Sequence, residues 1–246
     1  MNEYKENPAI PLTIGILAGM GPRSTSPFID LVITECQRQY GARHDIDFPR
    51  IMICSQPAPF YEDRPVDHAA LENAIRDGLQ HLERSGVDFL AIACNTAHVY
   101  YLNLKQGVRV PLLNMVELTV TAIPKNVGKV ALIAARPTTE SGVYHSCLRA
   151  RGIEVVDIDW QSDIDRLLSA TRDSTDPRLF EQLWAGLMDQ AHTADVDTIV
   201  LACLDLSGVA VHARTAIPIV DASHCLAKAI VARWLRRRNG GQLAYE

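Results

Sequence analysis

Residues 87–94 read VDFLAIAC, and residues 196–203 read VDTIVLAC. The two stretches match at the Val-Asp that opens them and at the Ala-Cys that closes them, 109 residues apart. Each is a short apolar run of the length of a buried strand, and each follows a segment with helical periodicity. The sequence therefore predicts two equivalent buried strands that end at Cys94 and Cys203.

Short apolar runs and helical segments alternate along the rest of the chain. The apolar runs are residues 13–18, 50–54, 89–94, 112–115, 130–134, 153–158, 198–203 and 217–220. The segments with helical period are residues 26–40, 67–85, 142–151, 177–194 and 223–237. This alternation is typical of an α/β fold in which helices flank parallel sheets.

Two further pairs of segments repeat in the same order. VPLL at 110–113 corresponds to IPIV at 217–220, and IGIL at 14–17 corresponds to VALI at 130–133. Three ordered matches predict two pseudo-symmetric lobes, residues 1–115 and 116–221, whereas chance similarity between valine-rich strands is the alternative. Because ligands bind beyond the carboxyl ends of parallel strands, we expect the active site in the cleft between the lobes.

A pair of thiols on opposite sides of one ligand suits a reaction that has two faces. Moving a proton off a carbon and returning one to the other face requires one base and one acid. The thiol pKa of about 8.5 falls readily near a helix N-terminus, so we expect it to be lowered at Cys94 and Cys203. A small buried side chain is the alternative for any free cysteine, and we prefer it for the other four, Cys36, Cys54, Cys147 and Cys225.

The residues after Cys94 read Asn95-Thr96-Ala97-His98. Polar capping residues there indicate a helix start whose N–H groups could hold a substrate carboxylate. His98 lies four residues after Cys94 and either orients or helps deprotonate it, or is a plain helix-surface or core histidine. Cysteine and histidine can also bind metal, but no second close pair completes a tetrahedral site, so we expect no metal.

Two loops offer further candidates for ligand binding. The turn at residues 18–22 reads AGMGP, which has neither the G-x-G-x-x-G pattern nor the lysine of a phosphate loop. Its glycines would bring the backbone close to a small ligand. Arg64 follows the second strand and is either a solvated surface residue or a fork for a substrate carboxylate.

Composition excludes several classes of partner. The chain has 246 residues, a net charge of −5 and a pI of about 5.9, which provide no general attraction to nucleic acid or to an anionic membrane. No apolar run is long enough to span a bilayer. The six cysteines form no C-x-x-C pair, which favours a reduced, cytoplasmic protein.

Several of these motifs resemble the aspartate/glutamate racemase family. Residues 14–22, IGILAGMGP, are similar to the family's opening motif, and residues 94–98, CNTAH, resemble the block around its first catalytic cysteine. Asp63-Arg64 resembles a substrate-binding D-R loop, and Ser141-Gly142-Val143-Tyr144 resembles a helix start in the second lobe. The resemblance extends from about residue 13 to about residue 235.

The resemblance implies an amino-acid racemase that needs no cofactor, has an amino acid as substrate and forms a homodimer. Cys94 and Cys203 would be base and acid, with roles that exchange between the enantiomers, and His98 and Asp205 would support them. A helix from residue 222 to 246 would pack back on the first lobe. The residues implied to bind substrate are Met20, Gly21, Gln56, Arg64, Asn95, Thr96, Thr138 and Leu204.

Two departures from the family pattern bear on substrate and reaction. The family's G-C-T-E block is here Ala202-Cys203-Leu204-Asp205, so a hydroxyl is missing at Leu204, although its N–H remains. Residues 157–165, DIDWQSDID, carry carboxylates where close aspartate racemases have a lysine, and these would repel an acidic substrate. A neutral, basic or aromatic amino acid is therefore open as the substrate.

Two other functions remain as alternatives. One is a decarboxylase or cis–trans isomerase of a small dicarboxylate, which could use a single cysteine for its key step. The other is an amino-acid-binding homologue without activity, which would have no use for paired thiols.

Overall fold

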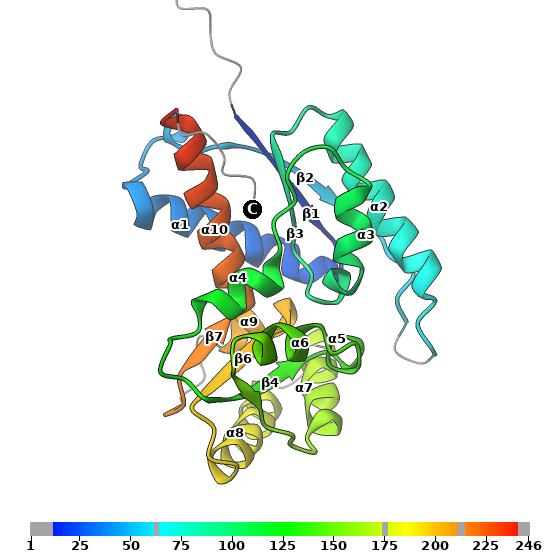
Figure 1. The fold of residues 1–246 in the computed structure, drawn as a ribbon, viewed down its shortest axis with the longest axis vertical. Coiled ribbons are helices and arrows are strands. Elements are labelled where there is room, and N and C mark those ends of the chain that lie inside the picture. Colours follow the sequence, from blue (N-terminus) through cyan, green and yellow to red (C-terminus); the bar gives the residue numbers. More distant parts are fainter. Residues whose placement is uncertain (1–11, 62–63, 174–176, 211–214, 241–246) are drawn as a thin grey trace, which may run out of the picture.

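The computed structural model describes residues 12–61, 64–173, 177–210 and 215–240. Within these residues the chain forms two parallel sheets, one in each of two lobes (Figure 1). The predicted α/β fold is confirmed. Residues 1–11 of the first predicted lobe and 241–246 of the predicted last helix lie outside the described residues.

The first lobe contains a three-stranded sheet. Its strands in spatial order are β2 (Arg50–Ser55), β1 (Thr13–Ala18) and β3 (Phe89–Ile92). One face packs against α1 (Thr25–Tyr40), and the other against α2 (His68–Arg84) and α3 (Tyr101–Gln106). Both faces of the central strand β1 are therefore covered, and all six of its residues are buried.

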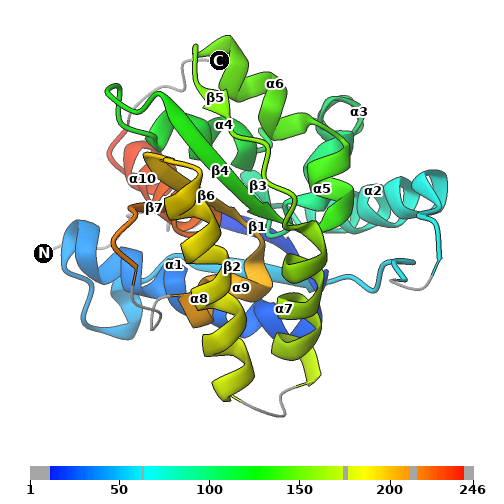
Figure 2. The same cartoon turned by 90° about the horizontal axis from the view of Figure 1, so that it is seen from below.

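The second lobe contains a four-stranded sheet. Its strands in spatial order are β5 (Glu154–Val155), β4 (Lys129–Ala134), β6 (Thr198–Ala202) and β7 (Ile219–Asp221). Figure 2 shows its two covering layers. One consists of α4 (Met115–Ala122) and α6 (Val143–Ala150), and the other of α7 (Gln161–Asp173), α8 (Pro177–Thr193) and α9 (Leu204–Ala210).

The internal repeat corresponds to equivalent hydrogen bonds in the two lobes. The carboxylate of Asp88 accepts the N–H of Thr13 at 2.7 Å, and that of Asp197 accepts the N–H of Lys129 at 2.8 Å. Each repeated aspartate therefore fixes the start of an inner strand of its own sheet, β1 in the first lobe and β4 in the second. The repeated prolines are equivalent too, since the carbonyls of Pro111 and Pro218 each accept an N–H of the neighbouring strand at 2.8 Å.

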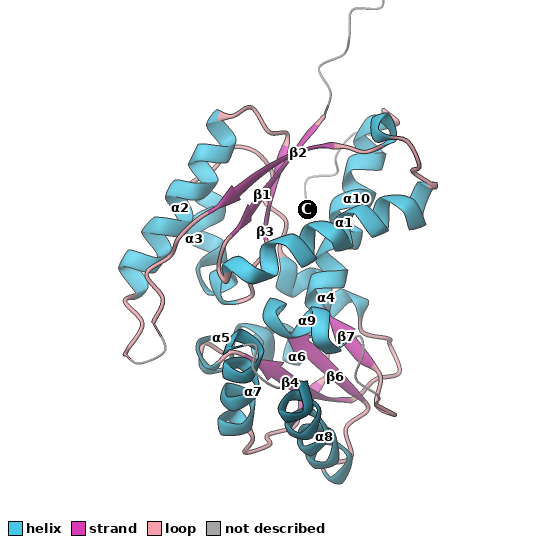
Figure 3. Cartoon of the chain, turned by 180° about the vertical axis from the view of Figure 1, so that it is seen from behind, coloured by secondary structure: helices cyan, strands magenta, loops and turns pink. Residues whose placement is uncertain are grey.

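The lobes exchange helices. The helix α10 (Ala222–Arg238) follows the second sheet but packs on α1 in the first lobe, through Leu226 and Ile230. Conversely, α4 follows the first sheet, lies where the lobes meet (Figure 3) and contributes Val116 and Val120 to the core of the second lobe. The described part of α10 therefore crosses to the first lobe, and α4 crosses in the opposite direction to the second.

The prediction of a strand at residues 112–115 is wrong. Only Leu112 forms a bridge, to Leu90, and α4 begins at Met115. The reason is Asn114, whose side chain accepts the N–H groups of Val116 and Glu117 and so caps the helix. The proposed lobe boundary at 115/116 coincides with this helix start and stays a prediction.

One other prediction of secondary structure needs correction. The strand expected at 153–158 shrinks to the two residues of β5. The acidic stretch at 157–165 leads instead into α7, because Ile164, Leu167 and Leu168 are buried at helical spacing.

Candidate active site

Cys94 and Cys203 occupy equivalent positions in the two lobes. Cys94 lies two residues after the end of β3, and Cys203 comes directly after β6. Both line one cavity of about 480 Å³ to which both lobes contribute. The structure therefore brings the two thiols predicted from the repeat to one cavity.

The turn after each cysteine directs backbone N–H groups at its sulfur. Those of Thr96 and Ala97 face Cys94, and those of Asp205 and Leu206 face Cys203. The donors are thus the second and third residues after the cysteine in both lobes. This arrangement at a helix start favours a thiolate.

Burial outweighs this effect at both sulfurs. It raises the pKa of Cys94 to about 11, although the two N–H groups lower it and the nearby Asp205 carboxylate raises it further. Burial, followed by the charge of Asp205, raises the pKa of Cys203 to about 12. The expectation of lowered thiol pKa values is therefore wrong, because desolvation penalises the thiolate more than the N–H groups favour it.

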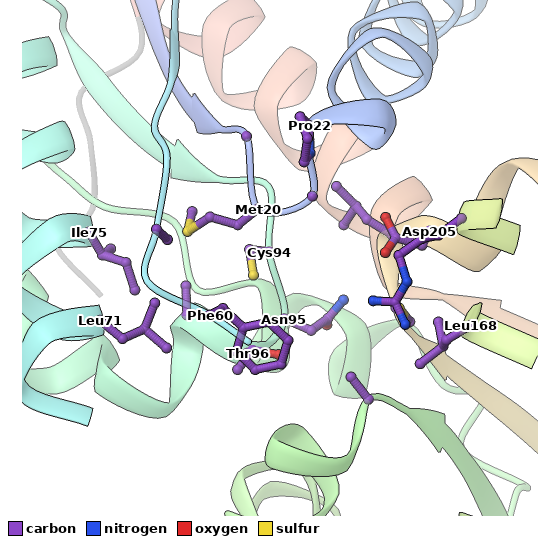
Figure 4. A pocket seen from close by; sticks show the side chains of 18 of the residues that line it. Met20, Pro22, Phe60, Leu71, Ile75, Cys94, Asn95, Thr96, Leu168 and Asp205 are labelled. Atoms are coloured by element: carbon purple, nitrogen blue, oxygen red, sulfur yellow. The ribbon is translucent and has the colours of Figure 1, made fainter. Parts of the chain in front are cut away.

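Six of the predicted binding and supporting residues line the cavity together with the thiols. They are Met20, Gly21, Asn95, Thr96, Leu204 and Asp205. Figure 4 shows the Cys94 sulfur at the centre, with Met20, Leu71 and Ile75 on one side of it and Asp205 and Leu168 on the other. Gly19, next to Met20, has a φ of +94° and lies against the backbone of Gln56, so no other residue fits there without strain.

Three predicted binding residues are not among those that line the cavity. Thr138 is fully buried behind it, where its hydroxyl lies 2.9 Å from that of Thr96. Gln56 is partly buried beside α2. Arg64 is exposed, with its guanidinium 4.4 Å from the ring centre of Tyr61, a residue that does line the cavity. Asp63 lies outside the described residues.

His98 is bonded to the backbone through both ring nitrogens. Its Nδ1 lies 2.8 Å from the carbonyl oxygen of Cys94, and its Nε2 accepts the N–H of Met115 at 3.0 Å. The proton must therefore be on Nδ1, and burial lowers the pKa of His98 to about 4, so the ring is neutral. His98 holds the turn in place and has no free nitrogen with which to deprotonate Cys94.

Asp205 connects the two lobes at the edge of the cavity. Its carboxylate accepts a hydrogen bond from the Ser24 hydroxyl of the first lobe, and it lies 3.5 Å from the position that a Cβ on Gly21 would occupy. The Asp205 carboxylate therefore lies in van der Waals range of the Gly21 turn of the first lobe.

Most of the apolar residues that line the cavity, and the cation Arg172, were not predicted from the sequence. The unpredicted lining residues are Pro22, Ala58, Phe60, Tyr61, Leu71, Ile75, Ala97, Ala135, Leu168, Arg172 and Ala202, whereas Gly19 belongs to the turn whose glycines were expected close to a ligand. Most lie on loops or helices and carry no motif, although the helical periodicity of 67–85 does place Leu71 and Ile75 on one face.

The argument that an acidic stretch would repel an acidic substrate is not supported. Asp157 and Asp159 are exposed, and Asp165 is bonded to Arg136. Of α7, only Leu168 and Arg172 line the cavity.

The described residues contain neither a metal-binding cluster nor a membrane-spanning helix. No group of three or more His, Cys, Asp or Glu side chains is placed to hold a metal ion. No helix in the described ranges is both long and apolar enough to cross a membrane.

A two-lobed α/β fold with paired thiols in one cavity defines a class of isomerase, and comparison with known proteins identifies the family. The model of the Asp/Glu/hydantoin racemase family matches residues 17–230. The broad specificity amino-acid racemase RacX of Bacillus subtilis (strain 168) is 46% identical over 223 residues, which are 90% of this chain and 98% of that one. The chain belongs to the Asp/Glu/hydantoin racemase family and is a racemase. The predicted family is confirmed.

Solved structures of similar proteins have the same two-lobed fold. The aspartate racemase of Picrophilus torridus is 27% identical, with a TM-score of 0.73 over 91% of this chain and 94% of that one. An aspartate racemase homologue from Pyrococcus horikoshii OT3, 20% identical with a TM-score of 0.72 over 91% and 99% of the two chains, shows the same fold.

Proposed function

We propose that the protein racemises amino acids without a cofactor, with Cys94 and Cys203 acting on opposite faces of the substrate Cα. The observation that supports this most directly is that two thiols from equivalent strand ends of the two lobes line one cavity. A single-thiol reaction would not need this equivalence.

In the proposed reaction one cysteine is a thiolate and the other a thiol. The thiolate takes the α-proton, and the thiol delivers its own proton to the opposite face of the same carbon. The roles exchange for the other enantiomer. The N–H groups at each turn stabilise the thiolate, and the carboxylate of Asp205, close enough to both sulfurs to raise their pKa values, would attract the substrate ammonium group.

The walls of the cavity would accept a broad range of substrate side chains, with a preference for apolar ones. Phe60, Leu71, Ile75 and Met20 form an apolar surface beside Cys94 (Figure 4), which would favour leucine or methionine over aspartate. The name of the Bacillus subtilis relative, a broad specificity racemase, agrees with this.

Independence from pyridoxal phosphate is part of the proposal, because that cofactor requires a Schiff-base lysine and the described cavity lining contains none. We expect full activity after treatment with hydroxylamine and dialysis against EDTA. A loss of more than half the activity, restored by pyridoxal phosphate or a divalent metal, would contradict it.

The decisive experiment follows α-proton exchange and optical rotation in D₂O for a panel of L- and D-amino acids. Cys94→Ala and Cys203→Ala should each abolish racemisation, whereas Cys147→Ala, a partly buried thiol outside the cavity, should retain it. Racemisation by either of the first two variants would rule out the two-thiol mechanism.

A cytoplasmic homodimer is also proposed, on the family resemblance and the absence of C-x-x-C pairs. Light scattering of the purified protein should give twice the chain mass of 27.2 kDa.

A further inference from the structure

Tyr144 makes a buried hydrogen bond from the second lobe to the turn that follows Cys94. Its hydroxyl donates to Oδ1 of Asn95 at 2.6 Å, and its side chain is fully buried in α6. In the sequence Tyr144 is the last residue of the Ser141-Gly142-Val143-Tyr144 helix-start motif. The bond therefore joins a residue without an assigned role to one that lines the cavity.

In this bond the Asn95 amide turns its oxygen toward the phenol. An amide oxygen only accepts and an amide nitrogen only donates, so a phenol that donates must meet the oxygen. Burial raises the pKa of Tyr144, which keeps the phenol protonated. The Nδ2 of Asn95 is then left on the other side.

That nitrogen is buried and has no hydrogen-bond partner among the described residues. Such a group costs free energy unless an acceptor reaches it. Figure 4 shows the Asn95 side chain extending from beneath Cys94 toward the second lobe. A ligand oxygen at this side of the cavity would supply the missing acceptor.

We propose that Tyr144 is a positioning residue that orients the Asn95 amide so that its N–H groups bind the substrate α-carboxylate. The inference rests on the proposed racemase function. The Asn95 amide would matter more for binding the α-carboxylate because Leu204 in the second lobe has no hydroxyl to donate to it. All amino acids share that carboxylate, so the effect of Tyr144 is independent of the substrate side chain.

The test is Tyr144→Phe, which removes the hydroxyl and keeps the ring. We expect KM to rise roughly tenfold, by the same factor for every amino acid that the wild type racemises, and kcat to change less than twofold, because uniform binding is lost. The shape of the pH profile of kcat/KM should not change. Tyr40→Phe is the matched control, since it loses a hydroxyl bond to Asp47 in the first lobe outside the cavity.

A double-mutant cycle separates positioning from a merely structural role. Asn95→Ala should raise KM at least as much as Tyr144→Phe, and adding Tyr144→Phe to it should change KM by less than twofold. The inference is overturned if Asn95→Ala has the wild-type KM, if the two effects multiply, or if Tyr144→Phe changes KM differently for different side chains. Absence of exchange in the wild type would instead refute the proposed function.

Discussion

Cys94 and Cys203 are each subject to two opposing effects, donation from backbone N–H groups and loss of solvent. The loss of solvent is the larger effect, so both thiols are neutral near pH 7, with pKa values of about 11 and 12. The base of the reaction must therefore be generated from a minor thiolate population. This makes the rate sensitive to pH and to nearby charge.

Asp205→Asn removes a negative charge that raises both thiol pKa values. The kcat/KM should rise with pH in wild type and variant, because the thiolate fraction increases as the pH approaches the thiol pKa. In the variant the rise should begin at lower pH, together with a higher KM from the lost attraction to the ammonium group. Proton exchange measured from pH 6 to 10 checks this, with Asp163→Asn, bonded to Gln190 outside the cavity, as control. Identical profiles for Asp205→Asn and wild type would contradict the assignment.

His98 provides a second prediction at the residue scale. Its pKa is lowered from 6.5 to about 4, so the unfolded chain binds a proton between these values that the folded chain does not. Stability should therefore fall as the pH decreases from 6.5 toward 4, by up to about 3 kcal/mol from this group. Urea unfolding at pH 7 and pH 4.5 should show a smaller difference in His98→Gln than in wild type, whereas the exposed His81→Gln should behave as wild type. An unchanged difference in His98→Gln would contradict this.

The exchanged helices α4 and α10 are the elements that hold the lobes together. Each begins with a capped turn directly after its own sheet and buries its apolar side chains in the other lobe. Neither lobe therefore has a complete core without the other. We expect the two to unfold in one transition.

Leu226→Ala tests this arrangement. Leu226 lies in α10 but is fully buried among first-lobe residues, so truncation should reduce the free energy of unfolding by about 3 kcal/mol. Probes of both lobes should report the same lowered midpoint. The control is Leu102→Ala, whose side chain is 73% exposed and should cost less than about 0.5 kcal/mol. Loss of structure in one lobe alone would show that the lobes fold independently.

At the scale of the whole molecule, the cavity exists only because the lobes face each other. Its apolar wall comes from the loop after β2 and from α2, and its polar edge comes from α7 and α9. Hydrogen bonds between Thr96 and Thr138, Asn95 and Tyr144, and Ser24 and Asp205 cross between the lobes around it. Substrate choice is thus a property of both lobes together.

Phe60→Ala tests the apolar wall. Phe60 lines the cavity and is 37% exposed, so its loss should raise the KM for leucine and phenylalanine roughly tenfold and that for alanine much less. Initial rates of racemisation for the three amino acids measure this, with Ile46→Ala, 89% exposed outside the cavity, as control. Equal effects on all three substrates would show that the side chain is bound elsewhere.

The sequence by itself determined the α/β fold, the strand that leads to each cysteine and the family, because these depend on local periodicity and on a repeat that aligns residue by residue. The repeat also marked the equivalent aspartates and prolines, although only the structure shows that each bonds to a neighbouring strand of its own sheet. Only the tertiary structure decided that burial raises the thiol pKa values, that His98 is bonded to the backbone, and that Arg172 and Phe60 line the cavity while Arg64 is exposed. Those properties depend on which distant segments surround a side chain and exclude water from it, and no local pattern in the chain encodes such contacts.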